Sequence, residues 1–293
     1  MSKSSLQIDR DHFDRMMDEV SVFGATPAGG LDRQTASIAD GEARRWLLEQ
    51  FQAAGLKTLI DPVGNMFGIL ELAGPDADIV LAGSHLDSQP KGGRFDGAYG
   101  VVAAVAAARA VKQAMSGSAH PATKNLAVVN WTNEEGARFA PSLLGSHVFT
   151  GKLDIQSARS ATDAKGVTLG DALDAIGFAG TDDAPRNIHS YLEIHIEQGP
   201  FLEAEKKSIG VVEGNWGTAK YEVDFHGKSA HTGPTPMAER RDPLVPVAEL
   251  ILFVRMLSDE TRVSGWTSCP SPSRVTRASR TGRSANAERA AST

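Results

Sequence analysis

Apolar and polar positions in the first two-thirds of the chain follow two periods, one helical and one typical of strands. Residues 40–54 place apolar side chains at helical spacing, and Gly55 follows as a stop signal. Residues 97–115 are rich in alanine and valine, which predicts a helix that is apolar on most sides and therefore buried. Apolar runs predict strands at 56–60, 66–72, 79–82, 125–131 and 191–196. This alternation is typical of a layered α/β domain.

The pattern changes near residue 214 and again near residue 258. In between, residues 220–226 alternate like a half-exposed strand, and residues 243–257 have the spacing of an amphipathic helix. Residues 258–293 have no period and few aliphatic side chains, so we expect them to be disordered. We therefore predict a first domain at 1–213, a partial second domain at 214–257 and a tail. The tail is basic, unlike the rest of the chain, and we interpret it as a frameshifted or aberrantly ended reading frame rather than a native basic tail.

Bulk composition narrows the class of protein. The net charge of −6 gives no reason to expect nucleic acid or an anionic membrane as a partner. No apolar run approaches the roughly 20 residues that a membrane-spanning helix needs, and residues 1–10 lack the apolar core of a secretory signal. The single cysteine, Cys269, excludes an internal disulfide. We expect a cytoplasmic protein.

Polar side chains follow three of the predicted strands, near the point where each strand ends. Because open α/β sheets place their sites at the carboxyl ends of strands, we expect these side chains to lie together. They are His85, Asp87 and Asp96 after the third strand, Glu134 and Glu135 after the fourth, and His195 and Gln198 at the end of the fifth.

Imidazoles and carboxylates together can hold divalent zinc, manganese or cobalt. Two such ions roughly 3.5–4 Å apart need a bridging carboxylate and separate ligands on each side. The candidates are His85 and His195 for one ion, Glu135 for the other, and Asp96 as the bridge.

Two further carboxylates have candidate roles beside the ligands. Asp87 stands two residues after His85, so on an extended segment both side chains face the same way, and Asp87 could accept the second imidazole N–H. Glu134 and Glu135 are adjacent, and their side chains should diverge. One can bind metal while Glu134 remains free for proton transfer in metal-assisted hydrolysis.

Each of these features also has a simpler interpretation. His195 lies among alternating apolar residues and could be a core histidine, while the Glu134–Glu135 pair could be a solvated acidic patch. His231 lies among turn residues and would ordinarily be a surface histidine. The combination favours a site, because several of these residues fall at strand ends within one α/β domain.

Five motifs resemble the dinuclear-metal amidohydrolase branch of the M20 metallopeptidase superfamily, which contains N-carbamoyl-L-amino acid hydrolases and allantoate amidohydrolases. The resemblance extends from about Ile8 to Leu257, and His195 in particular is similar to the carbamoylase type. The motifs are Gly83-Ser-His-Leu-Asp-Ser88, the segment 92–97, Asn133-Glu-Glu-Gly136, Glu193-Ile-His-Ile-Glu-Gln-Gly199 and His231-Thr-Gly-Pro-Thr-Pro-Met237.

The resemblance implies a mixed-sheet, three-layer αβα catalytic domain and the start of a small α+β lid that also carries a homodimer contact. It implies two divalent metal ions and hydrolysis of a linear ureido C–N bond, with release of carbon dioxide and ammonia. Gln198 would lie at the edge of the substrate or metal, and His231 on the lid would polarise the scissile carbonyl. The remaining implied roles are metal ligation by His85, Asp96, Glu135 and His195, general base for Glu134, and support of the ligands by Asp87.

The sequence departs from the family after Leu257, where the family supplies the rest of the lid and a final metal-binding histidine. We therefore expect an incomplete second metal site and impaired activity. Two alternatives remain: a non-catalytic fragment that binds a metal or a partner chain, and an M20-type peptidase or deacylase.

Overall fold

The computed structural model describes residues 6–116, 118–214, 221 and 223–261. The chain divides into two compact units, residues 1–204 and 205–293, and each is described by itself. The domain boundaries predicted at 213 and 257 remain predictions, and most of the predicted tail lies outside the described residues.

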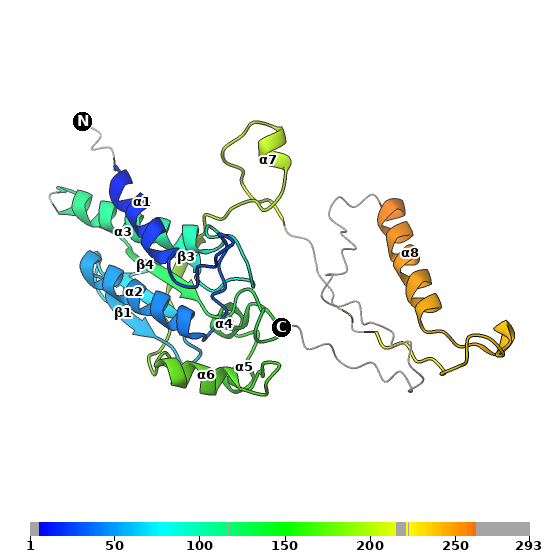
Figure 1. The fold of residues 1–293 in the computed structure, drawn as a ribbon. Coiled ribbons are helices and arrows are strands. Elements are labelled where there is room, and N and C mark those ends of the chain that lie inside the picture. Colours follow the sequence, from blue (N-terminus) through cyan, green and yellow to red (C-terminus); the bar gives the residue numbers. More distant parts are fainter. Residues whose placement is uncertain (1–5, 117, 215–220, 222, 262–293) are drawn as a thin grey trace. The chain divides into compact units, whose positions relative to one another are not determined.

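The first unit is built on a mixed sheet (Figure 1). Its five strands have the order β1-β2-β4-β3-β5. β1 pairs with β2 and β2 with β4 in antiparallel fashion, whereas β3 is parallel to both β4 and β5. The strands are β1 (Lys57–Ile60), β2 (Met66–Leu70), β3 (Ile79–His85), β4 (Asn125–Trp131) and β5 (Ile188–Leu192). The carboxyl ends of β3, β4 and β5 therefore share one edge of the sheet, and the mixed α/β sheet expected from the sequence is confirmed.

Several helices begin at a residue whose side chain accepts a hydrogen bond from a free backbone N–H. In α2, Ser37 accepts a hydrogen bond from the Asp40 N–H, and Gly55 ends the helix with a φ of 69°. In α6, Thr168 accepts from the Asp171 N–H. The helices of this unit are α1 (Arg10–Val20), α2 (Ile38–Ala54), α3 (Ala98–Met115), α4 (Leu144–Phe149), α5 (Ile155–Arg159), α6 (Leu169–Ile176) and α7 (Phe201–Ala204).

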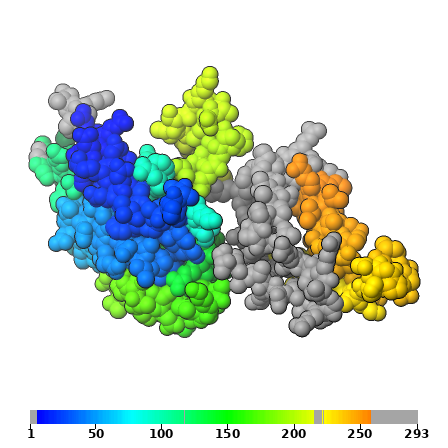
Figure 2. All heavy atoms as spheres, viewed as in Figure 1, coloured from blue at the N-terminus to red at the C-terminus, as the bar shows by residue number. Residues whose placement is uncertain are grey.

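The two faces of the sheet bury different amounts of apolar surface. The larger cluster joins Met66 and Val128 of the sheet to side chains from α1, α2, α3 and α6. In the space-filling view, the blue residues of α2 adjoin the green residues around α6 (Figure 2). The smaller cluster, on alternate strand positions, centres on Phe67 and Trp131, with Phe149 of α4 packed against it. Strand residues thus alternate between two cores, as burial on both faces requires.

Two strand predictions need correction. The strand expected at 191–196 is β5, which begins earlier and ends at Leu192, because its pairing with β3 ends at the pair Ala82–Leu192. Ile194 and Ile196 continue the alternation without a partner strand, and a period of two cannot distinguish a paired strand from an extended segment. Residues 223–226 of the strand expected at 220–226 are not in a strand, while Lys220 and Glu222 lie outside the described residues.

The second unit contains a short 3₁₀ turn, η1 (Met237–Glu239), and the helix α8 (Leu244–Thr261). The helix predicted at 243–257 is confirmed and runs past residue 257. Its exposed apolar side chains include Val245, Leu252, Phe253 and Met256. Among the described residues, no helix is long and apolar enough to cross a membrane.

Candidate metal centre

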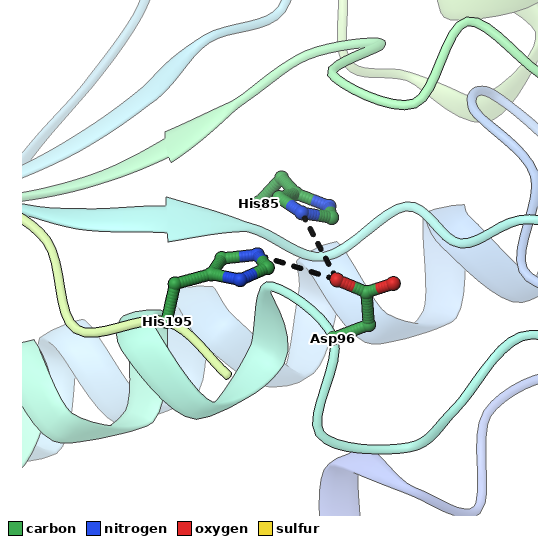
Figure 3. A group of neighbouring side chains, drawn as sticks. All are labelled: His85, Asp96 and His195. Carbon is green, nitrogen blue, oxygen red and sulfur yellow. Dashed lines mark ion pairs between the residues drawn. The ribbon is translucent and has the colours of Figure 1, made fainter. Parts of the chain in front are cut away.

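Three side chains from separate segments converge at the carboxyl edge of the sheet (Figure 3). His85 is the last residue of β3, Asp96 lies just before α3, and His195 lies three residues past the end of β5. Oδ1 of Asp96 is 3.2 Å from Nε2 of His195 and 3.9 Å from Nε2 of His85. The ligand atoms of the three residues all lie within 4.8 Å of one another, so the group could hold a metal ion.

Backbone carbonyls set the orientation of both imidazoles. Nδ1 of His85 lies 2.8 Å from the carbonyl oxygen of Asp87, and Nδ1 of His195 lies 2.9 Å from that of Ile196. Because a carbonyl can only accept, each Nδ1 carries the proton in the neutral ring, and the lone pair of Nε2 faces Asp96. Two imidazole lone pairs and a carboxylate oxygen are the donor set that a divalent transition metal prefers, so these residues fit such an ion.

Gly97 leaves room for the coordinating edge of His85. A Cβ at this position would lie 2.4 Å from Nε2 of His85, and the backbone φ of 63° is one that side-chain-bearing residues rarely adopt. The glycine therefore allows the backbone before α3 to lie against the imidazole.

The carboxylate of Asp87 supports the neighbouring loop more directly than it supports His85. Its Oδ1 is 3.7 Å from Nδ1 of His85, too long for a hydrogen bond, so the main-chain carbonyl takes the role that the sequence analysis gave to the side chain. Asp87 Oδ2 accepts from the hydroxyl of Thr35 at 2.8 Å, and the two carboxylate oxygens face the N–H groups of Glu134 and Glu135 at 3.3 Å. Burial raises the pKa of Asp87, although the charge of His85 opposes this.

Glu134 and Glu135 point in different directions. Oε2 of Glu134 lies 3.4 Å from Nε2 of His85, whereas Glu135 accepts from the side-chain amide of Gln89 at 2.8 Å. Burial raises the pKa of both glutamates. Burial lowers the pKa of His85, but the carboxylates of Asp87 and Glu134 outweigh it and the net shift is upward. The geometry therefore places the carboxylate of Glu134 beside His85, while that of Glu135 is held by Gln89.

The other two candidates have different surroundings. Gln198 donates to Oδ2 of Asp96 at 2.7 Å, which leaves Oδ1 facing the histidines. His231 lies in the second unit, where its Nδ1 accepts from the N–H of Gly233 at 3.0 Å.

Five residues that organise the site were not predicted from the sequence. Thr35 and Gln89 hold Asp87 and Glu135, and Ser84 and Tyr191 both donate to Glu193. Ser84 and Glu193 lie inside motifs that the sequence analysis identified. Their closeness in sequence to His85 and His195 could have indicated a role at the site. Nothing in the pattern around Thr35 or Gln89 marks them.

Comparison with known proteins identifies the family of this chain. Residues 81–266 match the model of peptidase family M20/M25/M40. An N-carbamoyl-L-amino-acid amidohydrolase from Rhizobium meliloti is 42% identical over 86% of this chain and 61% of its own length. The allantoate amidohydrolase of Escherichia coli (strain K12) is 37% identical over 79% of this chain and 57% of its own length.

A solved structure is also similar to this chain. The hydantoinase/carbamoylase family amidase of Burkholderia vietnamiensis superposes with a TM-score of 0.75 at 37% identity, over 88% of this chain and 62% of that one. The chain belongs to peptidase family M20/M25/M40, and the resemblance to its hydantoinase/carbamoylase branch is confirmed. It spans about 60% of the length of these relatives.

Proposed function

We propose that this chain carries the metal-binding part of an amidohydrolase that cleaves the C–N bond of an N-carbamoyl amino acid or a related linear ureido compound. The products would be the amino compound, carbon dioxide and ammonia. The observation that carries the proposal is the convergence of two imidazole Nε2 atoms on Oδ1 of Asp96, with the carboxylate of Glu134 beside them. The names of the relatives support the substrate class.

His85, Asp96 and His195 would hold a divalent ion, with zinc, manganese and cobalt all suited to these ligands. When bound there, such an ion would polarise the ureido carbonyl and increase the acidity of water. A second ion would need Asp96 as a bridge and Glu135 as a ligand. In the structure, the second oxygen of Asp96 accepts from Gln198, and Glu135 accepts from Gln89. Both carboxylates would have to exchange those partners, so we expect the second ion to bind weakly.

Glu134 would be the general base. Its carboxylate lies at the edge of the cluster, and its backbone is held by Asp87, so it could accept a proton from the attacking water. It would then return that proton to the leaving nitrogen. Gln198 would hold Asp96 in place. We also propose that it lies at the edge of the bound substrate.

The second unit would supply a lid. We propose that His231 polarises the carbonyl from there and that the exposed apolar side chains of α8 belong to a homodimer contact. Sedimentation equilibrium of the purified chain tests the dimer: a dimer that Phe253→Asp converts to monomer is expected, and a wild-type monomer at micromolar concentration would refute it.

The hydrolase proposal is tested with purified chain that is first stripped of metal and then supplied with zinc, manganese or cobalt. We expect slow release of ammonia from an N-carbamoyl-L-amino acid, and no hydrolysis of the matching N-acetyl compound. Glu134→Gln is the control, because it keeps the size of the side chain but not its basicity.

The outcomes separate the alternatives. Faster hydrolysis of the N-acetyl compound would favour a peptidase or deacylase. Metal binding without hydrolysis above the Glu134→Gln background would leave the binding fragment as the better account of this chain.

A further inference from the structure

The segment that carries His195 lies past the end of the sheet. Backbone pairing between β3 and β5 ends at Ala82 and Leu192, whereas β3 continues to pair with β4 as far as His85. The position of His195 relative to His85 therefore depends on contacts other than the strand ladder.

Glu193 supplies such a contact. The hydroxyl of Ser84, a fully buried residue, donates to its Oε1, and the hydroxyl of Tyr191 donates to its Oε2 at 2.7 Å. Tyr191 is itself held, because the indole N–H of Trp131 donates to its oxygen at 3.0 Å. The carboxylate of Glu193 thus joins the segment after β5 to the ends of β3 and β4.

This link lies close in sequence to both imidazoles. Ser84 immediately precedes His85, and Glu193 lies two residues before His195. The contact lies just beyond the last backbone pair, one residue past Leu192 in one segment and two residues past Ala82 in the other. A shift of Glu193 away from Ser84 would carry the backbone of His195 away from His85 and Asp96.

We propose that Glu193 is a positioning residue that sets the separation between His195 and His85 and so preassembles the metal cluster. The inference rests on the metal site of the proposed function. Glu193 is not proposed as a ligand, because each of its carboxylate oxygens accepts a hydroxyl proton and neither belongs to the three-residue cluster.

The test is titration of the metal-free full chain with Co²⁺, followed by the visible absorption of the bound ion. Loss of a group that orients a ligand typically weakens metal binding by about 10- to 100-fold, and we expect Glu193→Ala to fall in that range with an altered cobalt spectrum. Glu193→Gln should retain most of the affinity, because its amide can accept from Ser84 and donate to Tyr191. Ser84→Ala removes one of the two anchors and should lie between them.

Glu203→Ala, an exposed glutamate of α7, is the matched control and should bind Co²⁺ like the wild type. The unfolding temperature of each variant separates positioning from general stability. The proposal predicts that Glu193→Ala weakens Co²⁺ binding while its unfolding temperature stays within a few degrees of that of Glu203→Ala. If Glu193→Ala does not fold, Glu193→Gln and Ser84→Ala decide the question by their affinities and spectra.

Wild-type affinity and an unchanged spectrum in Glu193→Ala would overturn the proposal, and so would equal losses of affinity in the Ala and Gln variants. Failure of the wild-type chain to bind Co²⁺ is a different result, because it would refute the underlying metal site.

Discussion

The side-chain amide of Gln198 donates to Oδ2 of Asp96 at 2.7 Å, so that the other oxygen, Oδ1, faces both histidines. A carboxylate that is free to rotate would present either oxygen to the cluster. The amide removes that freedom, so the orientation of Asp96, the third candidate ligand, is fixed before any ion binds.

Replacement of Gln198 should therefore weaken metal binding. We expect Gln198→Ala to lower the affinity for Co²⁺ by about 10-fold, at the lower end of the usual effect of losing a group that orients a ligand. Isothermal titration calorimetry checks this, with Gln156→Ala, on an exposed face of α5, as the control. Equal affinities in the two variants would mean that Asp96 needs no such support.

A side chain at position 97 should weaken metal binding by more than backbone strain alone would explain. In Gly97→Ala the new Cβ would lie 2.4 Å from Nε2 of His85, at a φ of 63°. Gly151→Ala is the control, because it also places a side chain at a positive φ, 72°, but with no atom within 4 Å of the added carbon. We expect only Gly97→Ala to abolish Co²⁺ binding. If both variants bind alike, the close approach of Gly97 to His85 has no consequence for the metal.

The buried carboxyl of Asp61 should make the metal-free chain less stable as the pH rises. Burial raises its pKa to about 6, although N–H groups of Val63 and Asn65 partly oppose this. A raised carboxyl pKa stabilises the fold below the unfolded value of 3.8, and that contribution disappears as the pH rises through 6. The loss is up to about 3 kcal/mol, from 1.36 kcal/mol per pH unit.

Urea unfolding in EDTA between pH 4 and pH 7.5 measures this slope. Asp61→Asn should have a flatter dependence than the wild type. The slope should not vanish, because Asp87, Glu134 and Glu135 are shifted in the same direction. A variant slope equal to that of the wild type would show that Asp61 does not contribute.

The hydroxyl of Thr35 should matter for both stability and the position of Glu134. It donates to Asp87, whose carboxylate in turn faces the backbone N–H groups of Glu134 and Glu135. Thr35→Val keeps the shape of the side chain and should cost about 1.5–3 kcal/mol, the usual range for a hydrogen bond to a charged group. Thr150→Val, whose hydroxyl bonds only to backbone carbonyls at an exposed helix end, should cost less. Urea unfolding at pH 7.5 compares the two, and equal costs would contradict the role of Thr35.

The sequence predicted the elements whose pattern is local. α2 has helical spacing and ends at the stop signal Gly55, and β4 is a mostly apolar run whose bounds match the prediction. Meeting of His85 and His195 at one edge was also predictable, because strand ends in an α/β sheet share an edge once the strands are parallel.

The contacts that tune the site were not predictable, because each depends on which strands lie side by side. The link between Ser84 and Glu193 exists because β5 lies beside β3. The spacing of residues along the sequence does not indicate the order of the strands in the sheet. The spacing of His85 and Asp87 correctly indicated that the two residues interact. It could not distinguish the main-chain carbonyl, which makes the hydrogen bond, from the carboxylate, which supports Glu134.

The most direct test of the account is the binding of Co²⁺ to the wild-type chain, to His195→Ala and to His189→Ala, an exposed histidine of β5. The metal centre predicts one tightly held ion in the wild type and in His189→Ala, and loss of that ion in His195→Ala. Wild-type binding in His195→Ala would contradict it, because the ion would then be held elsewhere than by the cluster of His85, Asp96 and His195.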